Sequence, residues 1–311
     1  MREEKLSWKK LGLIFDPNAA PRHPKLISHA ANPLAVHLAD DVYRIFYSGR
    51  DAQNRSSVGA VDIDIVQHRI VQDHYEPCFT YGPQDSFYAD GVSIGNCYRA
   101  LDGQRFILFM GWQNPEDSHW RGDVGRLRLN DDFTLTLDPH MPFMGIDDAD
   151  PTSLSYPWVH QAGPQNYQMW YGSTRCWNSG NGEMLHVLNY ATSSDGHNWD
   201  RKGLSVPYEI GTAQAFSRPT VAKHPNGGLE MWFSYRGAPG PAYRIGYARA
   251  RDGETWIRMQ GRSGIEVADQ GWDSNMIEYP FVFDHGNARY MLYNGNGHGR
   301  SGFGLAILHR E

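Results

Sequence analysis

A pattern of two adjacent strands recurs five times along the 311-residue chain. Each copy begins with a short apolar segment introduced by Pro or Gly, passes through a turn, and ends in an aromatic-rich segment. The copies cover residues 32–50, 90–112, 156–175, 218–236 and 278–296. Subtracting residue numbers gives intervals of 58, 66, 62 and 61 between the markers Pro33, Gly91, Pro157, Pro219 and Pro280. A period of this length indicates a repeat architecture in which each unit packs against its neighbours.

Two further strands are predicted in each unit. The third strand corresponds to the segments SVGAVDIDI, DVGRLRLN, HVLNYATS, RIGYARA and FGLAILH. In two units a tight turn follows at Asp195-Gly196 and Asp252-Gly253, because glycine readily adopts the positive φ that such turns need. A tryptophan, Trp199 or Trp256, then begins the next strand. Each unit therefore reads as a four-stranded antiparallel meander.

The last unit lacks a fourth strand of its own, since the chain stops soon after its third strand. Residues 8–15 resemble residues 199–206, the fourth strand of the third unit. We therefore expect the N-terminal strand to pair as the outer strand of the last unit, which closes a ring and removes exposed sheet edges. The prediction is an all-β fold, a five-bladed β-propeller in one domain over residues 1–311. An open β-solenoid is the alternative, but in that fold the N-terminal strand would not be needed to complete the last unit.

The composition agrees with many short strands and narrows the function. Aromatic residues make up 13% of the chain, with 33 Gly and 18 Pro but only 21% charged residues, which argues against disorder, coiled coils and helical bundles. A net charge of -6 gives no basis for a nucleic-acid partner. No signal peptide or membrane span is recognisable, so a cytoplasmic location is expected. The sequence has no convincing metal-ligand spacing and no phosphate-binding glycine loop, so no metal or cofactor is expected.

Two sets of side chains are predicted to meet at one mouth of the propeller channel. The inner strand of each unit begins at this mouth, and the antiparallel second strand ends there. The inner-strand set is Asn32, Asp90, Tyr156, Arg218 and Glu278, and the second-strand set is Arg50, Trp112, Arg175, Arg236 and Asn296. Arginine binds carboxylate and phosphate through a bidentate fork, so the cluster predicts an anionic or sugar-like ligand. The alternative for each arginine is a salt bridge that holds neighbouring units together.

Asp90 and Glu278 are the candidate catalytic residues. Each ends a loop that begins with Asp-Ser, at Asp85-Ser86 and Asp273-Ser274. Two carboxyl groups that face each other across a channel suit acid/base or nucleophilic work on a glycosidic bond, and an acid among aromatic side chains can have the raised pKa of a general acid. The alternative is a carboxylate paired with a neighbouring arginine such as Arg218.

Aromatic and polar residues complete the predicted ligand site. Sugar rings stack on aromatic faces, which suits Trp112, Tyr156 and Tyr279, and sugar hydroxyl groups need polar partners such as Asn32 and Asn296. His29 and His298 are also expected near the mouth, as ligand contacts or acid/base groups. The expected partner is a sugar or glycan, with a sugar nucleotide as one possibility. The sequence leaves the oligomeric state open.

The repeat with its -Pro-x-Val- inner strands and Ser-x-Asp-Gly-x-x-Trp turn resembles the five-bladed propellers of glycoside hydrolase families 43, 32, 68 and 130. The segments at residues 28–33, 271–274 and 290–296 look like those of a poorly characterised bacterial group associated with surface-polysaccharide gene clusters. The hydrolase pattern implies acids from the first three blades, and only Asp90 matches it. Asn32 stands where an Asp is usual, and Tyr156 stands where a Glu is usual, which puts ordinary hydrolysis by that triad in doubt.

The predicted function is a carbohydrate-active enzyme that cleaves or transfers a glycosyl unit of an anionic or phosphorylated sugar at the channel mouth. One alternative is a glycosyltransferase or phosphorylase in surface-polysaccharide biosynthesis. Another is a propeller that binds glycans without catalysis, which the missing acids favour. A third is a scaffold in a polysaccharide-assembly complex. These alternatives differ in what the channel mouth does to a bound sugar.

Overall fold

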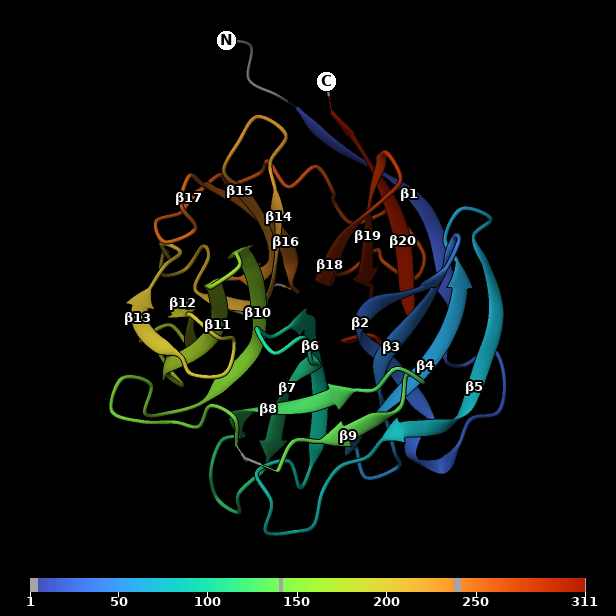
Figure 1. Ribbon diagram of the computed structural model, residues 1–311, viewed down its shortest axis with the longest axis horizontal. Coiled ribbons are helices and arrows are strands. Elements are labelled where there is room, and N and C mark those ends of the chain that lie inside the picture. The colour runs from blue at the N-terminus through green and yellow to red at the C-terminus, as the bar shows by residue number, and fades with distance from the viewer. Residues whose placement is uncertain (1–4, 140–141, 238–241, 311) are drawn as a thin grey trace.

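Strands make up nearly all the regular structure of the protein. A computed structural model describes residues 5–139, 142–237 and 242–310. Within these ranges there are β-strands and one short 3-10 helix, η1 (Pro24–Leu26). The strands are arranged in groups around a central axis (Figure 1). This is the all-β propeller that the repeat predicts.

Five antiparallel groups of four strands, here called blades 1 to 5, follow one another along the chain. Blade 1 contains β2 (Ser28–Ala39), β3 (Val42–Arg50), β4 (Ser56–Asp64) and β5 (Arg69–Phe79). Blade 2 contains β6 (Gly91–Arg99), β7 (Arg105–Gln113), β8 (Arg121–Leu129) and β9 (Leu135–Leu137). Blade 3 contains β10 (Leu154–Gly163), β11 (Asn166–Cys176), β12 (Leu185–Ser193) and β13 (Asp200–Leu204). Blade 4 contains β14 (Ala215–Lys223), β15 (Leu229–Arg236), β16 (Arg244–Ala250) and β17 (Ile257–Arg258).

Blade 5 combines strands from distant parts of the chain. It contains β18 (Glu278–His285), β19 (Ala288–Asn294), β20 (Phe303–Arg310) and the N-terminal strand β1 (Leu6–Phe15). β1 pairs antiparallel with β20, from Leu6 opposite Arg310 to Phe15 opposite Phe303. These first and last strands therefore lie side by side in Figure 1. The predicted pairing of the N-terminal strand with the last unit is confirmed.

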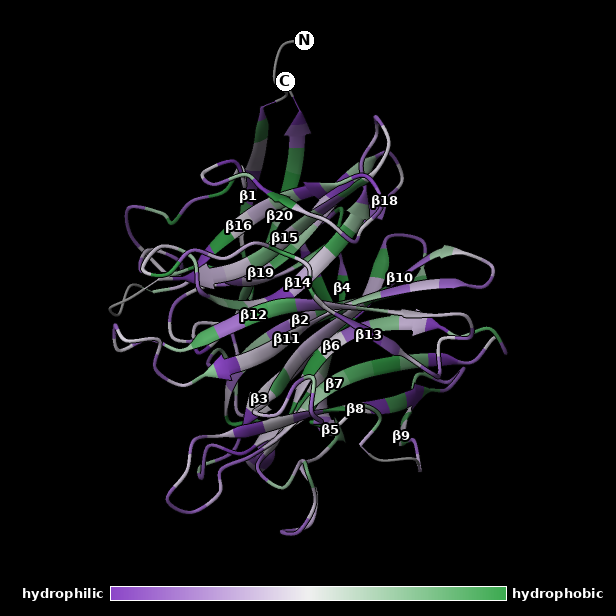
Figure 2. Ribbon diagram, turned by 90° about the vertical axis from the view of Figure 1, so that its left-hand side faces the viewer, coloured by the Kyte–Doolittle hydropathy of each residue, from purple (hydrophilic) through white to green (hydrophobic). Residues whose placement is uncertain are grey.

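An aromatic side chain recurs on the second strand of every blade and fixes the local packing. These residues are Tyr47, Phe109, Tyr171, Phe233 and Tyr293, and their third-strand partners are Gly59, Gly125, Asn189, Gly246 and Gly304. A β-carbon on Gly125 would lie 2.1 Å from the Phe109 ring, and one on Gly59 would lie 2.4 Å from the Tyr47 ring. The glycines therefore leave room for the rings. In Figure 2 the apolar residues follow the strands, while many loop segments are hydrophilic.

The strand register identifies one equivalent position in every inner strand, here called the ring position. It is occupied by Ala31, Ser93, Ser155, Ser217 and Glu278, which lie 62, 62, 62 and 61 residues apart by subtraction. Each of these five residues pairs with the residue that directly follows the recurring aromatic residue of the second strand. The register differs from the sequence prediction in two blades. In blade 5, Glu278 occupies the ring position itself, and the equivalent of Asn32, Tyr156 and Arg218 is the next residue, Tyr279. In blade 2, Asp90 lies three residues before the ring position. The reason is that blade 2 has no Pro in its inner strand, so Gly91 served as its marker.

The inner strands bulge next to the ring position. In blades 1, 3, 4 and 5 an X-Pro pair there opposes a single residue of the second strand. The residues before proline have positive φ: 55° at Asn32, 33° at Tyr156, 45° at Arg218 and 52° at Tyr279. Such conformations are uncommon outside glycine, and a bulge re-aims the side chain that it carries. The bulges therefore decide which side chains reach the channel mouth.

Candidate functional site

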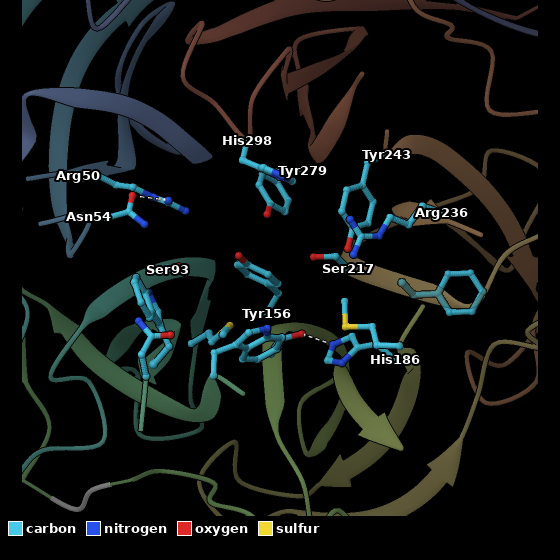
Figure 3. A pocket seen from close by; sticks show the side chains of 17 residues that line it. Arg50, Asn54, Ser93, Tyr156, His186, Ser217, Arg236, Tyr243, Tyr279 and His298 are labelled. Atoms are coloured by element: carbon cyan, nitrogen blue, oxygen red, sulfur yellow. Dashed lines mark hydrogen bonds between the residues drawn. The ribbon is translucent and has the colours of Figure 1, made fainter. Parts of the chain in front are cut away.

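A cavity of about 350 Å³ lies at the predicted mouth, where inner strands begin and second strands end. Figure 3 shows labelled side chains from several blades arranged around its open centre. Its lining comprises Arg50, Asn54, Ser93, Met110, Trp112, Asn114, Trp120, Ser155, Tyr156, Met184, His186, Phe216, Ser217, Arg236, Tyr243, Tyr279 and His298. The cavity is thus walled by aromatic and polar groups, and the described residues that line it include no Asp or Glu.

Some of the residues selected from the sequence line this cavity and others do not. Those in the lining are Arg50, Trp112, Tyr156, Arg236, Tyr279 and His298. Those outside the lining are His29, Asn32, Asp90, Arg175, Arg218, Glu278 and Asn296. The two groups differ in what their side chains contact.

Glu278 and His298 form a hydrogen-bonded pair at the edge of the cavity. The Glu278 side chain is fully buried, with 0% exposure, whereas the His298 side chain is 47% exposed. His298 Nδ1 lies 3.0 Å from Glu278 Oε1. Among the described residues, no group hydrogen-bonds to Glu278 Oε2. Burial raises the pKa of Glu278, and the hydrogen bond to that carboxylate raises the pKa of His298.

The three tyrosines of the lining are close to this pair. The Tyr243 ring packs edge-on against His298, with ring centroids 6.1 Å apart. Tyr156 and Tyr279 lie 5.4 Å apart between centroids, with an interplanar angle of 46°. Burial raises the pKa of Tyr279 well above its usual value, so its hydroxyl group stays protonated. Tyr279 therefore provides a ring face and a hydroxyl donor rather than a phenolate nucleophile.

The two lining arginines differ in charge balance. Arg236 forms a salt bridge with Glu183, with Nε 2.8 Å from Oε2, and lies 4.8 Å from the centroid of Tyr243. Arg50 donates from Nη1 to Asn54 Oδ1 over 2.7 Å. Within the described part of the chain, no carboxylate forms a salt bridge with Arg50. The positive charge of Arg50 is therefore available to the cavity.

Arg218 is buried beneath the cavity and links blade 4 to other blades. Its guanidinium group donates to the carbonyl oxygens of Pro33 at 2.7 Å, Tyr279 at 2.8 Å, Asn32 at 3.0 Å and Gly95 at 3.3 Å. Burial lowers its pKa to about 9. These contacts to blades 1, 2 and 5 make Arg218 a structural link at the channel centre.

Asn32 and His29 are also buried. The Asn32 amide nitrogen of the backbone donates to Asn294 Oδ1 over 2.9 Å. His29 Nδ1 forms a 2.9 Å hydrogen bond with Ser28 Oγ. Burial, followed by the charges of Arg50 and Arg300, lowers the pKa of His29 to about 3. His29 is therefore neutral near pH 7.

Asn296 and Arg175 contact the protein itself. Asn296 Oδ1 accepts hydrogen bonds from the backbone nitrogens of Asn275 at 2.8 Å and Met276 at 3.1 Å. The exposed Arg175 donates to Asn189 Oδ1 at 3.1 Å and to a backbone carbonyl. The contacts of Asn296 fix the loop before β18, and Arg175 lies outside the cavity.

Asp90 lies beside the cavity. Its Oδ2 accepts a hydrogen bond from the backbone nitrogen of Asn114 over 2.6 Å, and Asn114 belongs to the lining. The Asp90 carboxylate therefore holds a lining loop in place.

Several lining residues carry no strong sequence signal, and His186 is the most notable. His186 Nε2 lies 2.6 Å from Ser155 Oγ, and its Nδ1 lies 2.7 Å from Thr174 Oγ1. Burial lowers the pKa of His186 to about 4. Gly172 leaves space for the pair, because a β-carbon there would lie 2.1 Å from Ser155 Oγ. The 62-residue spacing of the ring-position serines is the signal that could have found Ser155.

The described residues contain no group of three or more His, Cys, Asp or Glu side chains arranged to hold a metal ion. No helix in the same residues is long and apolar enough to cross a membrane.

Solved structures share this fold. A solved complex of BT0996 with RGII aligns with a TM-score of 0.73 and 14% identity, over 97% of this protein and 92% of that one. A structure from the GH130 family of mannoside phosphorylases, which contains glycoside hydrolases that target β-1,2 mannosidic linkages in Candida mannan, aligns with a TM-score of 0.69 and 13% identity. It covers 97% of this protein and 94% of that one. The fold is therefore that of β-propeller glycoside hydrolase-like proteins.

Sequence comparison finds relatives with much higher sequence identity than the solved structures described above. No family model matches the chain. Two proteins of Mycobacterium tuberculosis, the uncharacterised proteins MT1551 and Rv1502, are each 41% identical to it over 305 residues, which are 97% of this chain and 99% of theirs. At this identity and coverage, the chain belongs to the same family as these two mycobacterial proteins.

Proposed function

We propose that the protein is a carbohydrate-active enzyme that transfers a glycosyl unit between a glycan and phosphate. The observation that carries this proposal is the charge of Arg50, which faces the cavity without a carboxylate partner among the described residues. An arginine in this state is suited to a phosphate or sugar-phosphate group. The buried guanidinium group of Arg218 adds positive charge beneath the same cavity.

The lining also limits the reaction. Hydrolysis by two carboxyl groups needs a nucleophile or a general base beside the sugar, and no described lining residue is an Asp or Glu. Phosphate is already an anion and attacks carbon without a base. Phosphorolysis therefore needs one protonating group and one anion site, which suits the composition of this cavity. The mannoside phosphorylases named for one fold neighbour support this reaction type.

The remaining lining supports a sugar ligand. Trp112, Tyr156 and Tyr279 offer ring faces, and Asn54 and Asn114 offer amides for sugar hydroxyl groups. The volume of about 350 Å³ lies at the lower end of the range for small-molecule sites. This volume suits one or two sugar rings with a phosphate rather than a long buried glycan.

The test is a turnover screen with a matched pair of variants. The purified protein is given sugar 1-phosphates with acceptor sugars, glycans with inorganic phosphate, and sugar nucleotides. Arg50→Gln is expected to raise the KM for phosphate or the sugar phosphate by about 10- to 100-fold, the effect of losing a charged hydrogen bond. Arg175→Gln, which lies outside the cavity, is the control and should leave KM unchanged. A turnover rate that is independent of phosphate and unchanged in Arg50→Gln contradicts the proposal. Turnover of sugar nucleotides alone favours a glycosyltransferase.

A glycan-binding protein without catalysis is the second candidate, favoured by the same lack of lining carboxylates. It predicts calorimetric binding of a glycan, weakened by Trp112→Ala, with no product formed from any donor. Measuring both heat and product on one panel separates the two functions.

A further inference from the structure

The structure keeps Glu278 out of the cavity lining and presents a histidine to the cavity. Glu278 is fully buried and lies outside the lining, whereas His298 belongs to the lining and half of its side chain is exposed. A substrate in the cavity can therefore touch His298 but not Glu278. The hydrogen bond of Glu278 to the lining is the one that it forms with the imidazole ring.

The backbone of the loop that carries His298 is held tightly against its neighbours. Gly297, His298 and Gly299 are consecutive residues with positive φ of 69°, 57° and 86°. The Gly299 carbonyl oxygen accepts a 2.8 Å hydrogen bond from the Ala30 nitrogen, and a β-carbon on Gly299 would lie 2.8 Å from the Ala31 Cα. The loop is therefore pressed against β2. Strained conformations that the surroundings fix in this way are common at functional sites.

The imidazole ring has distinct roles for its two nitrogens. Nδ1 donates to Glu278 Oε1 over 3.0 Å, which leaves Nε2 without a described protein partner. A carboxylate on Nδ1 fixes the ring and stabilises its protonated form. Nε2 is therefore the nitrogen that can give a proton to a bound molecule.

Glu278 is not required by the propeller itself. The equivalent ring positions of the other blades hold Ala31, Ser93, Ser155 and Ser217. Burying a carboxylate with one hydrogen-bond partner is unfavourable compared with burying a serine. The fold thus accommodates small residues at this position, and blade 5 is the blade in which a carboxylate takes their place and contacts a partly exposed histidine.

The charged and titratable groups that face His298 come from several blades. They are Glu278 on β18, His29 on β2, Arg50 at the end of β3, Arg236 at the end of β15 and Tyr243 before β16. Glu278 favours the protonated imidazole, whereas Arg50 and Arg236 oppose it. Opposed influences of this kind suit a group that both gives and takes a proton.

We infer that His298 is the catalytic proton donor of this cavity and that Glu278 is the residue that positions it. This inference rests on the proposed function. In the forward reaction, an oxygen of phosphate forms a bond to the anomeric carbon of the sugar. The bond from that carbon to the glycosidic oxygen breaks, its electron pair stays on the oxygen, and His298 Nε2 gives its proton to that oxygen. The imidazole is left neutral, and it takes the proton back when the reaction runs in reverse.

The first experiment tests His298 with two leaving groups. His298→Gln should lower kcat by about 10²- to 10⁴-fold for a glycoside with a sugar leaving group, the usual contribution of general acid catalysis. The nitrophenolate group of a nitrophenyl glycoside leaves without needing a proton, so kcat for that substrate should fall by less than about tenfold. Equal losses on both substrates, or no loss on either, overturn the assignment of His298.

The second experiment tests Glu278 without any substrate. Nuclear magnetic resonance follows the ring signals of the free protein with pH, and the His298→Gln spectrum identifies those of His298. Glu278→Gln should lower the pKa of His298 by about one to three units, because an adjacent opposite charge is lost. Glu278→Ser copies the residue of blades 2 to 4 and provides a second variant if Gln disturbs folding. An unchanged His298 titration in both variants overturns the positioning role.

The outcomes keep this inference distinct from the proposed function. Absence of turnover on every donor contradicts the proposed function and the catalytic role of His298 together, while the titration still decides whether Glu278 controls the imidazole. Turnover of phosphate-dependent substrates with full activity in His298→Gln contradicts only the assignment of the proton donor.

Discussion

The histidines on the blade 3 and blade 5 sides of the cavity contrast in burial and in hydrogen-bond partners. His186 is 2% exposed and lies between the hydroxyl groups of Ser155 and Thr174, whereas the side chain of His298 is 47% exposed and contacts a carboxylate. Burial lowers the pKa of His186 to about 4, while the Glu278 hydrogen bond raises the pKa of His298. Histidine is thus a neutral, buried part of the cavity wall in blade 3, whereas in blade 5 it is partly exposed and its protonated form is stabilised.

Removing each imidazole is the strongest test of this contrast. His186→Ala should lower the free energy of unfolding by about 3–5 kcal/mol, because it creates a cavity and leaves two buried hydroxyl groups without a partner. The double variant His298→Ala/Glu278→Ser should lower it by less than about 1 kcal/mol, because the partly exposed imidazole and its buried carboxylate partner are removed together. Urea unfolding at pH 7 measures both. Equal losses would mean that the two histidines play the same structural part.

The pH dependence of stability gives the next largest effect. The pKa of His186 falls from an unfolded value of 6.5 to about 4, so the unfolded state binds more protons between these pH values. Its contribution is therefore complete above pH 6.5 and is lost as the pH falls toward 4, with an upper bound of about 3 kcal/mol. His29, with a pKa of about 3, acts in the same direction.

The check on this pH prediction is a series of unfolding curves from pH 4 to 7. His186→Gln should show a shallower rise of stability with pH than the wild type, because only His29 of this pair then remains. A parallel curve would show that His186 is not neutral in the folded protein.

A smaller effect is expected from the space around His186. In Gly172→Ala the new β-carbon would lie 2.1 Å from Ser155 Oγ and 2.3 Å from His186 Nε2. Such overpacking should lower stability by about 1–3 kcal/mol. Gly163→Ala is the matched control in the same blade, since its β-carbon has no neighbour closer than 3.7 Å. Thermal unfolding compares the two variants. Equal unfolding midpoints would show that the residues around His186 can rearrange to accept the added methyl group.

The sequence predicts the fold better than the site for a physical reason. Strand order, turns and the pairing of β1 with β20 follow from the repeat and from the hydrophobic pattern, both of which can be read directly along the chain. The slip in blade 2 arose because Gly95-Asn96 occupies its bulge in place of an X-Pro pair. Because Gly91 is displaced from the true register, the repeat alignment treats Asp90 and Glu278 as equivalent although they occupy different positions.

The direction of side chains is what the sequence does not reveal. Tyr156 and Arg218 occupy equivalent bulge positions, yet Tyr156 lines the cavity and Arg218 reaches the carbonyl oxygens of other blades. That difference depends on contacts between blades far apart in the chain. The serines of the ring position were also missed, because a serine carries no chemical signal until its neighbours, such as His186, are known.

The shared last blade has a consequence for the order of events during synthesis. β1 emerges from the ribosome before the other strands of the propeller, and β20, the strand with which it pairs, is made last. Glu278 and His298 belong to the same late segment as β20. The proposed proton-donating pair is therefore completed only with the last blade, so a translation product that ends before His298 cannot carry it.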